Sequence, residues 1–244
     1  MAANRNKKGI ALDLKAEEGR ALARELIRRS DVVVENFRNG VAERLGIGFE
    51  DARALNPNII YCSISGFGAA GPKAQDPAFD LTVQAFSGFM GLNGLPGGEP
   101  VKPAVSIGDL MTGISAFAGI LGAVLRLRND PGAGAQLVST SLFESLSSYL
   151  TDASVMYQLN GSVRGPSDSF HANIALYGAF RAKDGYVAIG AGHDHIFKRL
   201  CAALHLEAEF PAAYGDDSGL RYRRRQEIRE ILERRDLSAC VPWA

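Results

Sequence analysis

The chain has 244 residues, 46% hydrophobic and 22% charged, which is ordinary composition for a globular protein. Lys and Arg (27) balance Asp and Glu (27), and a net charge of zero argues against nucleic acid as a partner. The three cysteines are far apart and form no CxxC, which argues against zinc and disulfides and favours a reducing cytoplasm. We see neither an apolar run of the ~18 residues that a membrane span needs nor a signal peptide. We therefore expect a cytoplasmic protein, without a membrane partner, of one large or two small domains.

The first third of the chain alternates strand-like and helix-like segments. Apolar residues at helical spacing, such as Leu22 and Leu26, predict a helix over 17–29. Further short helices are expected over 41–45 and 49–55. Strands are expected over 9–14, 31–34 and 59–64. This alternation predicts an α/β fold, a Rossmann-like parallel sheet with helices packed on its faces.

The middle of the chain is mainly helical. A loop rich in Gly and Pro over 66–77 precedes two apolar helices, predicted over 79–90 and 110–128. Residues 91–100 form a flexible connection between these helices. A turn at 129–132, a strand over 136–138 and a helix over 141–160 follow.

The last third has a different character. Residues 161–173 are polar and are typical of a linker, and 179–189 predict a hairpin around Asp184-Gly185. Helices are expected over 193–204 and 223–235. We therefore assign 1–165 to part of a large domain and 166–244 to a linker and part of a smaller α+β domain.

Asp109 has two interpretations. It follows Gly108 at the start of a predicted helix, where a carboxylate commonly accepts hydrogen bonds from free backbone N–H groups as a cap. The same helix end would keep the carboxylate ionised and present it as a nucleophile. Asp80 also opens a predicted helix and has the same two interpretations, since two acidic helix starts could face one cavity.

The segment 35–40 follows a predicted parallel strand, at the edge where open α/β sheets bind ligands. Backbone N–H groups there, with Arg38 and Arg44, could hold a phosphate. The alternative is a solvated turn with two surface arginines, and Lys15 is a similar case.

Other common sites find little support. The sequence has no GxGxxG, no P-loop motif and no GxSxG, which argues against dinucleotide, P-loop and hydrolase chemistry. His193 and His195 are two residues apart and would not share a helix face, so we expect no metal site.

Six segments, taken in order, carry a resemblance to a known family. They are 4–15, 31–40 with 44–46, 61–68 with 71–72, 77–80, 108–113 and 175–186. Together they resemble the class III CoA-transferase family, also called CaiB/BaiF, with formyl-CoA transferase-like members. The match covers nearly the whole chain.

The resemblance implies an enzyme that moves CoA from an acyl-CoA to a carboxylic acid, without a metal. It places the nucleophile at Asp109, which would pass through an aspartyl anhydride and an aspartyl-CoA thioester. It also implies a set of residues that bind coenzyme A. These are Leu12, Lys15, Asn36, Phe37, Arg38, Arg44, Asp76, Pro77, Ala78, Phe79 and Asp80. The expected assembly is a homodimer, interlocked in full-length members.

Two alternatives accompany this expectation. An α-methylacyl-CoA racemase of the same family would pair the aspartate with a histidine where this chain has Phe79, and Phe cannot transfer a proton. Family members are longer at both ends, so the chain resembles a piece truncated at both ends, and an inactive fragment is the second alternative. The composition names neither the donor acid nor the acceptor acid.

Overall fold

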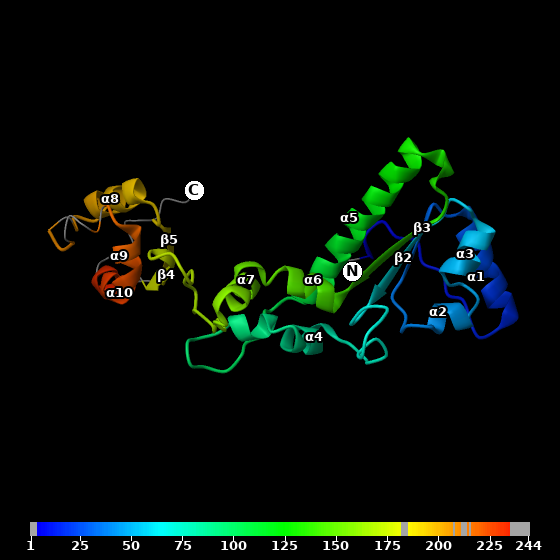
Figure 1. Cartoon of the computed structure of the whole chain (residues 1–244), viewed down its shortest axis with the longest axis horizontal. Coiled ribbons are helices and arrows are strands. Elements are labelled where there is room, and N and C mark those ends of the chain that lie inside the picture. Colours follow the sequence, from blue (N-terminus) through cyan, green and yellow to red (C-terminus); the bar gives the residue numbers. More distant parts are fainter. Residues whose placement is uncertain (1–3, 182–184, 207, 211–213, 215, 235–244) are drawn as a thin grey trace. The chain divides into compact units, whose positions relative to one another are not determined.

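The computed structural model describes residues 4–181, 185–206, 208–210, 214 and 216–234. The chain divides into two compact units (Figure 1). The first comprises residues 1–92 and 100–164, and the second comprises 93–99 and 165–244. The assignment of residues 1–165 and 166–244 to a large and a small domain stays a prediction.

A parallel sheet of three strands organises the first unit, as predicted. Its order is β1-β2-β3. The strands are β1 (Val32–Glu35), β2 (Ile60–Ser65) and β3 (Gln136–Ser141). Side chains alternate between the two faces of a strand. One face therefore carries Val33, Tyr61 and Leu137, and the other carries Val34, Cys62 and Val138.

Three helices lie on the Tyr61 face of the sheet. They are α1 (Glu17–Arg29), α2 (Val41–Arg44) and α3 (Phe49–Leu55). Their buried apolar residues Ile27, Ala42 and Ala52 form one cluster with Tyr61. The predicted ranges of α1 and α3 agree with the structure to the residue, because their apolar positions repeat at helical spacing.

The opposite face is covered by α5 (Ile107–Asn129), the long helix labelled in Figure 1. A Cβ at Gly119 would lie 2.7 Å from Val138 Cγ1, so this glycine lets the helix approach the sheet closely. A short 3₁₀ turn, η3 (Pro131–Ala133), leads from α5 into β3 at the predicted turn. Helices on both faces confirm the predicted α/β class.

Three further helices complete this unit. They are α4 (Asp80–Phe86), α6 (Leu142–Ser148) and α7 (Thr151–Asn160), with a 3₁₀ turn η2 (Phe89–Leu92) after α4. Val83, Leu142 and Leu146 are buried together and join α4 to α6. This small core fixes the position of α4 beside α5.

Three predicted elements in this unit differ most from the structure in extent or kind. Residues 9–14 form no strand, since they pair with no strand of the described chain and Ile10 is 69% exposed. The helix expected over 79–90 ends at Phe86, because Gly88 adopts a φ of 82°. The helix expected over 141–160 is two helices, with a break before Thr151, whose φ is 41°.

The expectation that no apolar segment reaches the length of a membrane span was also wrong. Among the described residues, α5 is long and apolar enough by length and composition, since its charged residues lie near its ends. One such helix is weak evidence for a membrane span, and only 11% of its apolar window is buried, on the side where α5 packs on β2 and β3.

The second unit is a small α+β body, as predicted. The strands β4 (Tyr177–Arg181) and β5 (Tyr186–Gly190) form the predicted antiparallel hairpin. Asp184 of its predicted turn lies outside the described residues. The helices are α8 (Asp194–Ala203), α9 (Ser218–Arg223), which was not predicted, and α10 (Arg225–Glu233). Phe180, Phe197 and Ile228 are central to its core.

Candidate active site

A cavity of about 420 Å³ lies at the carboxyl ends of β1 and β2. Open parallel sheets bind ligands at this edge. Four segments line the cavity, namely the loop after β1, the loop between β2 and α4, the first turn of α5 and the first residue of α6. Its lining includes Asn36, Phe37, Arg38, Asp76, Pro77, Ala78, Phe79, Asp80 and Asp109. The fold therefore brings nine of the twelve predicted site residues to one hollow.

Asp109 projects into this cavity from the first turn of α5. Ser106 is the N-cap of the helix, so the interpretation of Asp109 as the cap was wrong. The positive end of the helix dipole stabilises a carboxylate at this place. Partial burial and the nearby Asp80 carboxylate raise the pKa of Asp109, while Lys102 opposes them. Asp109 is thus an accessible carboxylate on the cavity wall.

Asp80 belongs to α4, yet its side chain accepts a hydrogen bond from the first turn of α5. Its Oδ1 accepts a hydrogen bond of 2.8 Å from the backbone N–H of Gly108, 28 residues away. Its Oδ2 accepts one of 2.6 Å from Nε2 of Gln84, a fully buried side chain. The charge-assisted hydrogen bond between the Asp80 carboxylate and the backbone of Gly108 joins α4 to α5. Asp80 therefore holds the turn that carries Asp109.

Gly108 is required at the point where α4, α5 and α6 meet. A Cβ there would lie 2.9 Å from Asp80 Oδ1 and 3.0 Å from Leu146 Cδ1. Both neighbours are buried and have little room to move. The glycine therefore permits the hydrogen bond by which Asp80 holds the first turn of α5.

The loop after β1 is fixed by its own asparagines. Asn36 Nδ2 donates to the carbonyl of Ile64 at 2.6 Å. Asn39 Nδ2 donates to the carbonyls of Gly68 and Ala74 at 2.9 and 2.8 Å. Asn39 was not among the predicted site residues, yet it ties the two loops of the cavity together. Arg38 is exposed beside them and forms no side-chain ion pair with a described residue.

Three of the predicted CoA-binding residues do not line the cavity. Lys15 and Arg44 are exposed at other places on the same unit, and Leu12 lies in the irregular segment before α1. Arg44 reaches back toward the loop after β1, since a Cβ at Gly40 would lie 3.1 Å from its Nη1. Their role in binding CoA stays a prediction.

Two residues beside the site were missed by sequence reasoning. Lys102 Nζ lies 3.9 Å from Asp80 Oδ2, and Gln84 contacts the same oxygen. Lys102 lies in a Pro-rich connection and Gln84 inside an apolar helix, so no local pattern marks either residue. Among the described residues, no group of three His, Cys, Asp or Glu could hold a metal ion.

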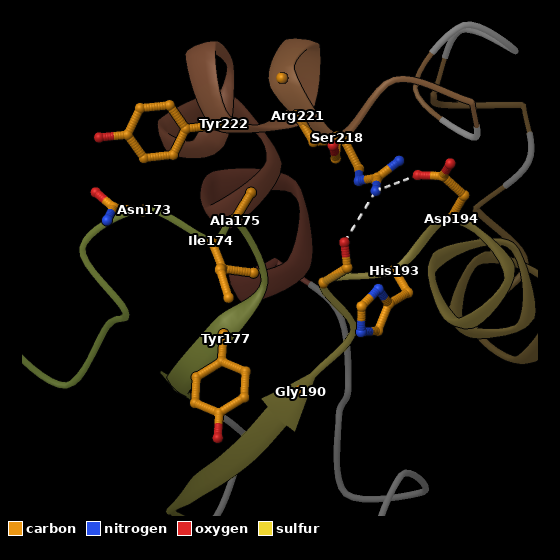
Figure 2. Close-up of a pocket in the computed structure, with 12 residues that line it drawn as sticks. Asn173, Ile174, Ala175, Tyr177, Gly190, His193, Asp194, Ser218, Arg221 and Tyr222 are labelled. Atoms are coloured by element: carbon orange, nitrogen blue, oxygen red, sulfur yellow. Dashed lines mark hydrogen bonds and ion pairs between the residues drawn. The ribbon is translucent and has the colours of Figure 1, made fainter. Parts of the chain in front are cut away.

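The second unit contains a separate cavity of about 640 Å³ (Figure 2). Figure 2 shows the Arg221 guanidinium between the Asp194 carboxylate and a backbone carbonyl. Arg221 also donates to the carbonyl of Tyr214 at 2.5 Å and packs on the ring of Phe197. Its charge is used to hold α8 and α9 together, so the carboxylate pair of the first cavity is the stronger candidate for chemistry.

The sequence as a whole matches known CoA-transferases. Residues 1–239 match the model of CoA-transferase family III, and the chain belongs to this family. It is 36% identical over 232 residues to succinate–glutarate CoA-transferase of Agrobacterium fabrum. It is 40% identical over 202 residues to acetyl-CoA:oxalate CoA-transferase of Acetobacter aceti. These matches cover 95% and 82% of the chain but 57% and 51% of the two relatives, so the chain spans about half their length.

Solved structures give the same assignment. A CaiB/BaiF family protein from Brucella suis superposes with a TM-score of 0.79 at 34% identity, over 94% of this chain and 60% of that one. Rv3272 from Mycobacterium tuberculosis gives a TM-score of 0.80 at 27% identity, over 94% of this chain and 59% of that one. The predicted fold and family are thereby confirmed.

Proposed function

We propose that the complete native protein transfers CoA from an acyl-CoA to a carboxylic acid, with Asp109 as the nucleophile. The observation that carries this proposal is the accessible Asp109 carboxylate in the first turn of α5, facing the cavity at the edge of the sheet. The named relatives, which transfer CoA between succinate and glutarate or between acetate and oxalate, support the substrate class. They do not select one pair of acids for this chain.

The proposed reaction begins with attack on the thioester. A carboxylate oxygen of Asp109 bonds to the acyl carbon, the carbon–sulfur bond breaks, and CoA leaves as a thiolate. The thiolate then attacks Cγ of Asp109 in the mixed anhydride and releases the donor acid as its carboxylate. The products of this half-reaction are a free carboxylate and an aspartyl-CoA thioester.

The second half reverses these steps with the acceptor acid. The acceptor carboxylate attacks the aspartyl thioester, which expels CoA thiolate and forms a second anhydride. The thiolate attacks the acceptor's acyl carbon, and Asp109 leaves as a carboxylate. No proton is gained or lost over the cycle, so the site needs an ionised aspartate and no general acid.

Coenzyme A is proposed to enter between the loop after β1 and the loop before α4. Arg38 is exposed in the lining of the cavity, where it could pair with a phosphate. A charge-assisted bond contributes roughly 1.5–3 kcal/mol, so Arg38→Gln is expected to raise the KM for acyl-CoA about ten- to hundredfold. An unchanged KM would remove Arg38 from the CoA site.

Racemisation at the α-carbon is disfavoured by the residue before Asp80. Phe79 lines the cavity and is 74% exposed, but its ring has no proton to give or accept. We expect no exchange of the α-proton of a 2-methylacyl-CoA in deuterium oxide. Rapid exchange catalysed by the protein would favour a racemase instead.

The decisive experiment identifies the acylated residue. Wild-type protein is incubated with succinyl-CoA, trapped with hydroxylamine or borohydride, and digested for mass spectrometry. The adduct is expected on Asp109, and Asp109→Asn should lose both the adduct and CoA transfer. Asp130→Asn, which changes a carboxylate at the opposite end of α5, is the control and should retain both. An adduct on another residue would overturn the assignment.

A homodimer is part of the proposal. Leu110, Ile114, Phe117, Leu121 and Leu125 are each 46–62% exposed and recur every three or four residues along α5. An apolar stripe of this kind commonly marks an interface. Sedimentation of the complete protein as a monomer at micromolar concentration would count against it.

A further inference from the structure

Lys102 is held beside the Asp80 carboxylate by its own loop. Its Nζ donates to the backbone carbonyls of Pro103 at 2.8 Å and Val105 at 3.4 Å. The same atom lies 3.9 Å from Asp80 Oδ2, and the side chain is 33% exposed. Two carbonyl acceptors from the segment that leads into α5 therefore fix the ammonium group beside the Asp80 carboxylate.

The site needs such a positive charge because it contains two neighbouring acids. Asp80 is buried with its carboxylate bonded to the backbone of Gly108, and Asp109 is the next residue. Like charges close together in a partly desolvated place disfavour the ionised form of one of them. The proposed reaction requires Asp109 to be ionised, and the first turn of α5 requires a hydrogen-bond acceptor at Asp80.

Other charged groups line the cavity into which Asp109 projects. Arg38 from the loop after β1 and Asp76 from the loop before α4 line the cavity, while α6 contributes the apolar Leu142. In the effect on the pKa of Asp109, burial comes first, Asp80 second, and Lys102 acts in the opposite direction. The positive charge of Lys102 lowers the pKa of Asp109.

We propose that Lys102 is a positioning residue whose positive charge, held beside the Asp80 carboxylate, keeps the Asp109 nucleophile ionised. This inference rests on the proposed function, because it assigns a role in the same reaction. Lys102 contacts Asp80 and acts on Asp109 through its charge. It lies in the segment that leads into α5, the helix that carries Asp109.

Gln84 offers a neutral comparison on the same carboxylate. Its Nε2 donates to the Asp80 oxygen that lies near Lys102, and it brings no charge. Its Oε1 has no hydrogen-bond partner among the described residues. Gln84 therefore holds Asp80 in place, whereas Lys102 supplies the charge, and the two roles can be separated by substitution.

The test is a titration of Asp109 followed by ¹³C NMR of aspartate carboxyl carbons, with the Asp109 signal assigned by its absence in Asp109→Asn. Lys102→Met and Lys102→Gln are expected to move the titration to higher pH, and Lys102→Arg should restore it. Gln84→Met should leave the midpoint in place. Lys198→Met, which removes a surface lysine of the second unit, is the control. An unmoved titration in both Lys102→Met and Lys102→Gln would overturn the proposal.

The pH dependence of kcat/KM gives a second readout in the complete native protein. Its acid limb should move to higher pH in Lys102→Met with the plateau reached at more alkaline pH, and should return in Lys102→Arg. An equal shift in Gln84→Met would indicate a merely structural role and count against the charge. If wild-type protein forms no adduct on Asp109, the proposed function fails, while the NMR titration still decides whether Lys102 acts on Asp109.

Discussion

Substitution of Gly108 by alanine tests the packing that places the nucleophile. The new Cβ would lie 2.9 Å from Asp80 Oδ1 and 3.0 Å from Leu146 Cδ1, and both are buried. Overpacking at such a place costs about 1–3 kcal/mol. Alanine in place of glycine within a helix returns about 1 kcal/mol through its higher helix propensity.

Gly113 is the matched control on the same helix. A Cβ at Gly113 would meet no atom within 4 Å, so Gly113→Ala should gain about 1 kcal/mol of stability without a packing cost. Gly108→Ala should therefore be less stable than Gly113→Ala by about 1–3 kcal/mol, the overpacking cost alone. If the Asp80 hydrogen bond to Gly108 is also lost, the difference grows by roughly 1.5–3 kcal/mol.

Urea unfolding of the three proteins measures these free energies directly. Intact secondary structure by circular dichroism and an unchanged m-value would show that the native states are comparable. CoA transfer by Gly108→Ala should fall further than by Gly113→Ala, because the turn that carries Asp109 is displaced. Equal stability of the two alanine variants would refute the inference that Gly108 is required by close contact with Asp80 and Leu146.

Other predictions concern the core, the pH profile and the second unit. Leu146→Ala, at a fully buried position, should lower the free energy of unfolding by about 2–5 kcal/mol in urea, and a loss below 1 kcal/mol would contradict the packing described. Since burial and the Asp80 charge raise the pKa of Asp109, kcat/KM should fall with decreasing pH at a midpoint above the usual aspartate range, and a lower midpoint would be inconsistent with this environment. Arg221→Met should destabilise the second unit by about 3–5 kcal/mol because it strands buried acceptors, whereas Asp194→Asn should cost less since that side chain is half exposed; equal losses would contradict this.

Local sequence patterns were sufficient where an element's own residues decide its conformation. The helix α1 was predicted to the residue because its apolar positions repeat at helical spacing between Lys15 and Ser30. The strand β2 was predicted from its apolar run and the hairpin β4–β5 from its Asp-Gly turn, both within one or two residues at their ends. The segment 9–14 has the same strand-like composition, but a strand also needs a neighbour to pair with, and composition does not supply one.

The candidate site likewise contains residues that local motifs predict and residues that only packing brings together. The Gly108-Asp109 pair and the acidic residue at position 80 stand out in the sequence, and the family's ordered motifs point to both. The contact of Lys102 and Gln84 with the same Asp80 oxygen did not stand out, since neither residue lies in a recognisable motif. Their role depends on which helices come together, and that is a long-range property.

The sequence by itself therefore determined the alternation of strands and helices, the family, and the aspartate that opens α5. The tertiary structure alone decided that Ser106 is the N-cap of that helix and that Asp80 satisfies its Gly108 N–H from another helix, 28 residues away. Helix propensity and capping patterns act over a few neighbouring residues, whereas a buried carboxylate takes the donors that packing brings to it.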